Sequence, residues 1–139
     1  VWEKGVVVKE FGDQVEILGH PSVGGFVSHG GWNSVTETVW KGVPFCHTWP
    51  QHSDQKMSAE VMRISGMGIW PEEWGWGTQD VVKGKEIAKR IKEMMSNESL
   101  RVRTAEMKEA ALKVAGVGGS CESTRKSFEE WKRNAQEST

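Results

Sequence analysis

Tyrosine is absent from this 139-residue chain, and cysteine, proline and one-sided charge are scarce. The two cysteines, Cys46 and Cys121, stand far apart without metal-type spacing, so we expect no metal site and a reducing, cytoplasmic setting. A formal net charge of −1 argues against a dedicated nucleic-acid binder. No apolar run approaches the roughly 20 residues of a membrane helix. We therefore expect the chain to bind neither nucleic acid nor a membrane.

Several catalytic signatures are missing as well. No pair of histidines stands four residues apart around a glutamate, and the patterns G-x-S-x-G, G-x-x-x-x-G-K and G-x-G-x-x-G do not occur. The sequence therefore gives no support to a zinc protease, a serine hydrolase, a P-loop enzyme or a dinucleotide-binding enzyme. The chain opens on Val1 and runs at once into an apolar triplet, which we interpret as a cut from a longer protein.

The first half of the chain alternates short apolar runs with glycine turns and helical spacing. Strands are expected at 6–8, 24–28, 45–49 and 67–70, helices at 32–40 and 53–65, and a loop at 71–77. The second half is charged, and its apolar spacing predicts helices around 87–94, 100–114 and 123–132. The pattern predicts an α/β fold, a parallel sheet with flanking helices at 1–82 and a helical C-terminal extension at 83–139.

The segment from Val27 to Ser34 joins an expected strand to an expected helix through two glycines. The first backbone N–H groups of such a helix lack internal partners, and its dipole attracts anions. His29, Asn33 and Ser34 add side-chain donors, so the segment is typical of a phosphate site. The alternative is an ordinary strand-to-helix turn in which Asn33 only caps the helix.

Three further groups of polar residues fit a nucleotide sugar. Glu37 shares a helix face with Ser34, and a carboxylate there suits the two hydroxyls of a ribose, although it could be a plain surface residue. Asp54 and Gln55 follow the expected strand at 45–49 and could bind sugar hydroxyls, unless Ser53 or Asp54 merely caps a helix. Phe11 and Gln14 could stack on and bracket a base, although a phenylalanine is more commonly a core residue.

Taken together, these residues resemble the secondary-product glycosyltransferase box of plant UDP-sugar-dependent glycosyltransferases, a family with the GT-B fold. The resemblance covers residues 11–55. It is carried by the following residues: Phe11, Gln14, Ile17-Leu18, His20, Gly25 to Ser34, Glu37, Gly42-Val43-Pro44, Trp49-Pro50 and Asp54-Gln55.

The resemblance implies a fold for the chain and a role for nine of these positions. The chain would be the Rossmann-like C-terminal half, which binds the sugar donor, most simply UDP-glucose, without a metal or cofactor. The acceptor and the catalytic histidine would belong to an N-terminal half, so no catalytic residue is expected in this chain. The implied ligands are as follows: Phe11 and Gln14 for uridine, His29, Asn33 and Ser34 for the diphosphate, Glu37 for ribose, and Trp32, Asp54 and Gln55 for the sugar.

This sequence departs from the pattern of the box at several places. Phe11 replaces a tryptophan, Asp13 a proline and Gly30 the commoner cysteine, and the segment from Pro44 to Asp54 is one residue longer. The tryptophan-rich stretch at 68–77 resembles the flavonoid C-glycosyltransferase branch, and the alternative is that its tryptophans only pack a surface loop onto the helical half.

We therefore expect the donor-binding portion of an inverting glycosyltransferase that transfers glucose to a phenolic or flavonoid acceptor as a C-glycoside. It would work with the N-terminal half of the same enzyme, in the same chain or in a separate one. Two alternatives stay open: an O-glucosyltransferase of phenolic small molecules, and a non-catalytic UDP-sugar-binding fragment.

Overall fold

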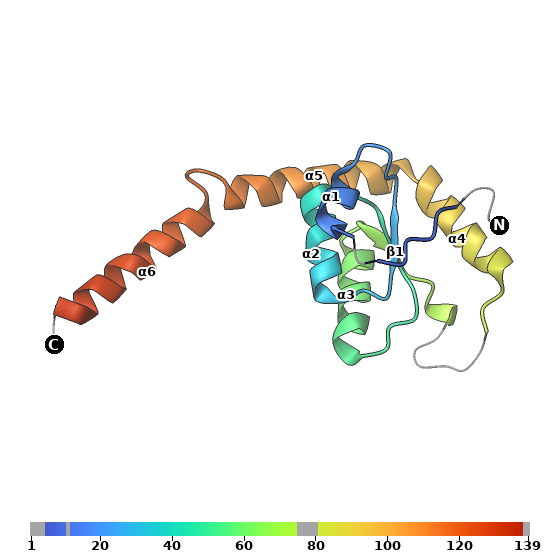
Figure 1. Ribbon diagram of the computed structural model, residues 1–139, viewed down its shortest axis with the longest axis horizontal. Coiled ribbons are helices and arrows are strands. Elements are labelled where there is room, and N and C mark those ends of the chain that lie inside the picture. The colour runs from blue at the N-terminus through green and yellow to red at the C-terminus, as the bar shows by residue number, and fades with distance from the viewer. Residues whose placement is uncertain (1–4, 11, 75–80, 138–139) are drawn as a thin grey trace.

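A three-stranded parallel sheet lies at the centre of the chain, in the order β1-β2-β3. The computed structural model describes residues 5–10, 12–74 and 81–137. The strands are β1 (Phe26–Ser28), β2 (Phe45–His47) and β3 (Gly68–Ile69), and each is shorter than the sequence predicts. Helices α2 (Trp32–Lys41) and α3 (Ser53–Ile64) connect them in turn (Figure 1). The expected α/β fold with a parallel sheet is confirmed.

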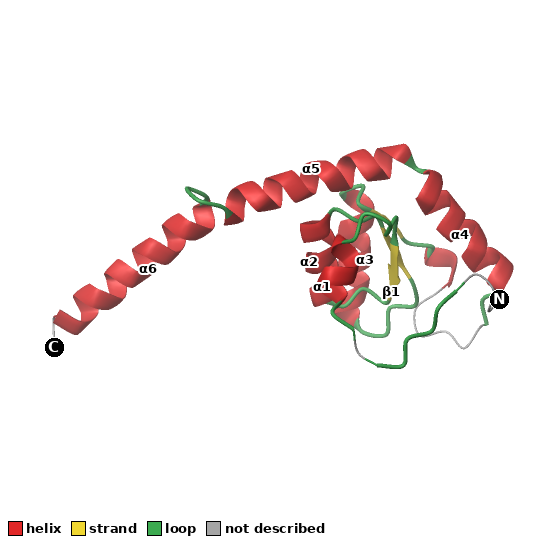
Figure 2. Cartoon of the chain, turned by 45° about the horizontal axis from the view of Figure 1, so that its top comes forward, coloured by secondary structure: helices red, strands yellow, loops and turns green. Residues whose placement is uncertain are grey.

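Helices cover both faces of this sheet, as Figure 2 shows. Neighbouring residues of a strand point to opposite faces, so Phe45 and Cys46 belong to different clusters. Phe45 packs with Val35 of α2 and Met62 of α3. On the other face, Cys46 packs with Met94 of helix α4 (Gly84–Ser96). Burial on both sides fixes the sheet, and with it the positions of the loops that leave its strands.

Residues Val6 to Val8 do not form the buried strand that their β-branched side chains predict. They lie outside any strand and are 89%, 64% and 71% exposed, respectively. Within the described residues β1 pairs only with β2, so its other edge has no partner strand. A strand of three apolar residues is buried only when neighbouring strands pair with it and helices cover its faces, and no strand of the described residues pairs with residues 6–8.

Helix α1 (Gln14–Gly19) is an element that the sequence analysis does not anticipate. It begins at a capping pattern: the side-chain oxygen Oδ1 of Asp13 accepts a hydrogen bond from the backbone N–H of Glu16 at 2.9 Å. The pairing of an aspartate with a glutamate three residues later is the signal that could have predicted it. The helix packs against α2, and this contact brings Gln14 to the functional site.

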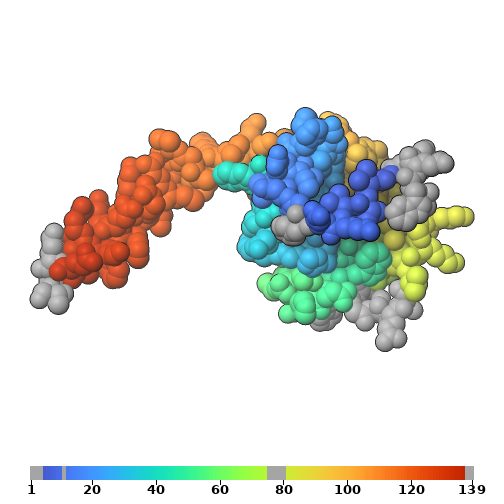
Figure 3. Space-filling model, viewed as in Figure 1, coloured from blue at the N-terminus to red at the C-terminus, as the bar shows by residue number. Residues whose placement is uncertain are grey.

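The C-terminal part consists of three helices: α4, α5 (Glu98–Ala115) and α6 (Ser120–Glu137). Asn97 ends α4 and caps α5, because its Oδ1 accepts a hydrogen bond from the N–H of Leu100 at 3.1 Å. Helix α5 packs against α2, whereas α6 extends away from the body of the molecule (Figures 1 and 3). The last helix is longer than the 123–132 predicted. Of the helices described, none is both long and apolar enough to cross a bilayer.

Candidate functional site

The predicted phosphate turn lies at the carboxyl end of β1. His29 is exposed, Gly30 has a φ of +84°, and Gly31 is the N-cap of α2. Because Gly31 has no side chain, the cap of α2 leaves the first backbone N–H groups available to an anion. The alternative in which Asn33 is the helix cap is wrong, since Asn33 lies inside the first turn of α2.

A buried histidine closes the space beneath this turn. A Cβ atom added to Gly30 would lie 2.2 Å from the Cε1 and Nδ1 atoms of His47, so only glycine fits here. His47 is fully buried, and within the described residues neither ring nitrogen has a hydrogen-bond partner. Burial, with a smaller effect from the nearby His29, lowers the pKa of His47 to about 4. The ring is therefore neutral at pH 7.

Sequence reasoning missed His47, because its position depends on pairing between segments distant in sequence. In the register of the sheet, His47 stands opposite Ser28, the last residue of β1. The histidine therefore lies next to the turn that follows Ser28. Alternation along β2 predicts only that its side chain points away from that of Cys46.

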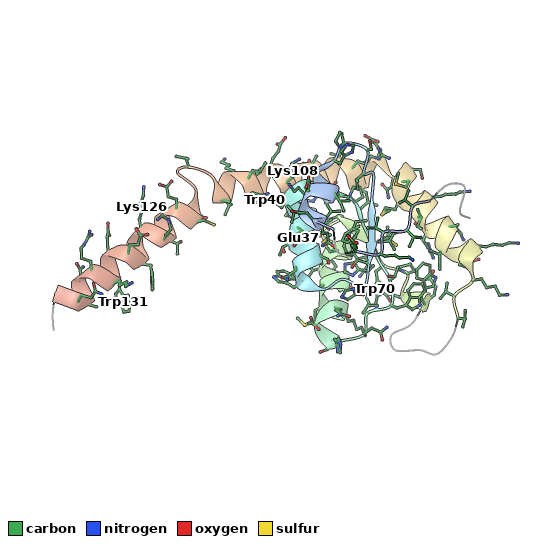
Figure 4. The ribbon with its side chains drawn as sticks, viewed as in Figure 1. Glu37, Trp40, Trp70, Lys108, Lys126 and Trp131 are labelled. Carbon is green, nitrogen blue, oxygen red and sulfur yellow. The ribbon has the colours of Figure 1, made fainter. Side chains whose placement is uncertain are left out.

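Gln14, Ser34 and Glu37 lie close together, and only the shared helix face of Ser34 and Glu37 could be read from the sequence. The amide Nε2 of Gln14 donates to Oε2 of Glu37 at 2.7 Å and to Oγ of Ser34 at 3.5 Å. Glu37 lies on α2 beside α1 (Figure 4). The carboxylate has further lone pairs to accept hydrogen bonds from a ligand. The pair of helices thus presents a fixed acidic group one turn beyond the phosphate turn.

Asp54 and Gln55 occupy the first turn of α3, at the carboxyl end of β2. The N-cap of this helix is His52, so the alternative that Ser53 or Asp54 caps it is wrong. Instead, Oε1 of Gln55 accepts hydrogen bonds from the backbone N–H groups of Gln51 and His52, at 2.7 and 3.2 Å. Gln55 is only 7% exposed, whereas Asp54 is exposed. These bonds hold the amide oxygen, so its NH₂ group is the part left to donate to a ligand.

The residues predicted to bind the diphosphate and the sugar follow two neighbouring strands, since His29 comes after β1 and Asp54 and Gln55 come after β2. Because β1 and β2 are parallel neighbours, the turns after both strands lie at the same edge, where open parallel sheets bind ligands. Trp32 is exposed at the start of α2. Phe11 lies outside the described residues, as do the last three positions of the stretch at 68–77.

A cavity of about 620 Å³ lies elsewhere, by β3 and the start of α5, where Gly68, Asn97 and Leu100 are among its lining residues. None of the predicted ligand-binding residues lines it.

Comparisons with known proteins identify the family of the chain. The sequence profile of the family described as "UDP-glucoronosyl and UDP-glucosyl transferase" matches residues 3–114. The chain belongs to this family. It is 85% identical over 137 residues to UDP-glycosyltransferase 708D1 of Glycine max, covering 98% of this chain and 28% of that protein. The chain thus spans little more than a quarter of the length of that relative.

Solved structures agree in fold. The structure of LpCGTa in complex with UDP has a TM-score of 0.86 and 42% identity, and the match covers 93% of this chain and 30% of that one. The structure of Medicago truncatula UGT71G1 complexed with UDP-glucose has a TM-score of 0.71 and 38% identity, covering 79% of this chain and 24% of that one. The expected relation to the C-terminal half of a GT-B glycosyltransferase is confirmed.

Proposed function

We propose that this chain is the donor-binding portion of an inverting, UDP-sugar-dependent glycosyltransferase. The observation that carries the proposal is the glycine turn before α2 with the Gln14–Glu37 hydrogen bond beside it, at the ligand-binding edge of a parallel sheet. Two solved neighbours were determined in complex with UDP and with UDP-glucose, which supports a UDP-sugar as the ligand.

Each part of the site has a role in this proposal. The N-terminus of α2 with His29, Asn33 and Ser34 binds the diphosphate, and Glu37 accepts hydrogen bonds from the ribose hydroxyls. Gln14 and Phe11 bind uridine. Exposed Asp54 accepts hydrogen bonds from sugar hydroxyls while the oriented NH₂ of Gln55 donates to another, with Trp32 beside the ring. The proposed sugar is glucose.

The chemistry follows from where charge develops. A nucleophilic atom of the acceptor forms a bond to the anomeric carbon from one face, while the bond from that carbon to the diphosphate oxygen breaks on the other. The electron pair leaves with UDP, and the donors at the phosphate turn stabilise its growing negative charge. A base outside this chain takes the acceptor proton, so the chain itself supplies no catalytic residue.

The remaining part of the enzyme is the proposed partner, because the chain spans only 28% of UDP-glycosyltransferase 708D1 of Glycine max, the soybean relative. Two apolar features of the surface are candidates for contact with it. One is the exposed triplet from Val6 to Val8 and the other is the pair Phe128 and Trp131 on α6, whose rings stack at 5.7 Å and are exposed. Both cysteines are free, which fits a reducing location such as the cytoplasm.

We propose a phenolic or flavonoid acceptor and a carbon–carbon bond to the sugar, on the resemblance of the stretch at 68–77. A deprotonated phenol is nucleophilic at its oxygen and at the neighbouring ring carbon, so the orientation of the acceptor decides the product. The product of a transferase that contains this chain should be boiled in acid. A C-glycoside keeps its sugar, whereas release of the sugar would favour the O-glucosyltransferase alternative.

The donor site can be tested on the 139-residue chain by titrating it with UDP in a calorimeter. Glu37→Ala removes the ribose acceptor and should weaken binding by about tenfold or more, the usual cost of a hydrogen bond to a charged group. The matched control is Glu109→Ala, an exposed glutamate on α5, which should leave the affinity unchanged. Equal affinities for the two variants would contradict the proposed site.

A further inference from the structure

A strained residue lies between β2 and the sugar-binding turn. Trp49 has a φ of +37°, and in the described chain every other residue with a positive φ is a glycine. This conformation is costly for a bulky residue, and it persists only where the surroundings enforce it. Trp49 is followed by fully buried Pro50 and then by the turn that leads into α3. Its backbone therefore sets the direction of that turn.

The ring of Trp49 is held by a second tryptophan from a distant part of the chain. Trp74 lies almost parallel to it, with ring centroids 5.2 Å apart and an angle of 18° between the planes. Trp74 is only 7% exposed and ends the 3₁₀ helix η2 (Glu72–Trp74). A stacked pair of this kind stabilises by more than its buried area alone.

The helix η2 is in turn fixed to the body of the protein. Glu73 forms an ion pair with Arg90 of α4, which also pairs with Glu93 at 2.8 Å. Glu72 lies 3.7 Å from Arg63 of α3. These exposed pairs contribute little stability individually, but together they attach η2 to two helices.

The backbone at Trp49 is linked directly to Gln55. Gln51 donates from its side-chain Nε2 to the carbonyl oxygen of Trp49 at 3.0 Å, and its backbone N–H donates to Oε1 of Gln55 at 2.7 Å. A shift of Trp49 would therefore change the orientation of the Gln55 amide and the start of α3, where Asp54 lies.

We propose that Trp74 is a positioning residue for the sugar of the donor. By stacking on Trp49 it holds the strained backbone, and through Gln51 it holds the amide of Gln55 in the orientation that donates to a sugar hydroxyl. The inference rests on the proposed function, since it needs a UDP-sugar at this edge of the sheet. It assigns to η2, outside the box at 11–55, a part in recognising the sugar while leaving recognition of UDP to other elements.

The test compares the affinities of the 139-residue chain for UDP and for UDP-glucose by calorimetry. In Trp74→Ala we expect the affinity for UDP-glucose to fall by about tenfold, the cost of a misdirected hydrogen bond, while the affinity for UDP changes less than about twofold. Trp74→Phe keeps an aromatic ring, so this variant should retain most of the affinity for UDP-glucose that Trp74→Ala loses. Trp40→Ala, which removes a half-exposed tryptophan from the far end of α2, is the matched control.

A double-variant cycle separates positioning from general support of the fold. In Trp49→Gly the backbone adopts a positive φ without strain. Trp74→Ala should therefore weaken UDP-glucose binding much less in the Trp49→Gly variant than in the unaltered chain. Should Trp74→Ala fail to fold, Glu73→Gln loosens η2 from Arg90 while keeping the stack, and should weaken UDP-glucose binding by about twofold.

The outcomes distinguish this inference from the proposed function. Equal weakening of UDP and UDP-glucose by Trp74→Ala, or additive effects in the cycle, would overturn the positioning role and leave the donor site standing. Failure of the unaltered chain to bind UDP would overturn the donor site itself.

Discussion

His47 should make the stability of the chain fall as the pH falls from 7 to 5. Its pKa is about 4 in the folded chain, against 6.5 for an unperturbed histidine, because burial disfavours the charged ring. The unfolded chain therefore binds a proton in this range that the folded chain does not, and acid favours unfolding. Linkage with these two pKa values gives a loss of about 2 kcal/mol between pH 7 and pH 5. The loss approaches about 3 kcal/mol near pH 4.

The perturbation that isolates this effect is His47→Leu, which fills a similar volume and cannot titrate. The free energy of unfolding is measured with urea at pH 7, 6 and 5. Between pH 7 and pH 5 it should fall by about 2 kcal/mol more in the unaltered chain than in the variant. The comparison stops at pH 5 because carboxylates such as Glu60, Glu73 and Glu122, whose pKa values are lowered by hydrogen bonds, titrate below it. Parallel pH profiles for the two proteins would refute the reasoning, since His47 would then be protonated equally in both states.

Three further predictions concern the turn, the sugar and the proposed partner of the chain. Gly30→Ala should cost about 3 kcal/mol or more in urea unfolding, because it adds backbone strain and a contact with His47, whereas Gly84→Ala, with open space around it, should cost nothing. In a transferase made by joining this chain to the N-terminal part of the soybean relative, Asp54→Ala should lower turnover of UDP-glucose about tenfold but change UDP affinity less than twofold; equal losses would make Asp54 a structural residue. The 139-residue chain alone should transfer no sugar, and the joined transferase should, as product analysis by chromatography would show. Transfer by the chain alone would contradict the assignment of the base to another part.

The local parts of the fold could be predicted from the sequence. The strand, glycine turn and helix around Gly30 follow from apolar runs, a glycine pair and helical spacing, all within a few residues. The end of α2 at Gly42, which has a φ of +71°, follows equally from a local signal. The positions of Ser34 and Glu37 on one face of that helix follow from its period.

The parts that depend on distant segments could not be predicted in this way. Val6 to Val8 have the composition of a buried strand, yet burial depends on neighbours that the local pattern does not contain. The contact between His47 and Gly30 comes from the register of β1 and β2, and the stack of Trp74 on Trp49 joins residues 25 positions apart. The backbone N–H groups of residues 51 and 52 donate to the side-chain oxygen of Gln55. These hydrogen bonds could be predicted only if the start of α3 at Ser53 were already known.

The contact between Gly30 and His47 implies a rule of covariation among related sequences. The space beneath the turn holds either the imidazole at position 47 or a side chain at position 30. It cannot hold both, because a Cβ atom at position 30 would lie 2.2 Å from the ring. Relatives with a larger residue than glycine at position 30 should therefore carry a small residue where this chain has His47, and histidine should accompany glycine. The residues at the two positions should then change together, although they lie 17 positions apart in the sequence.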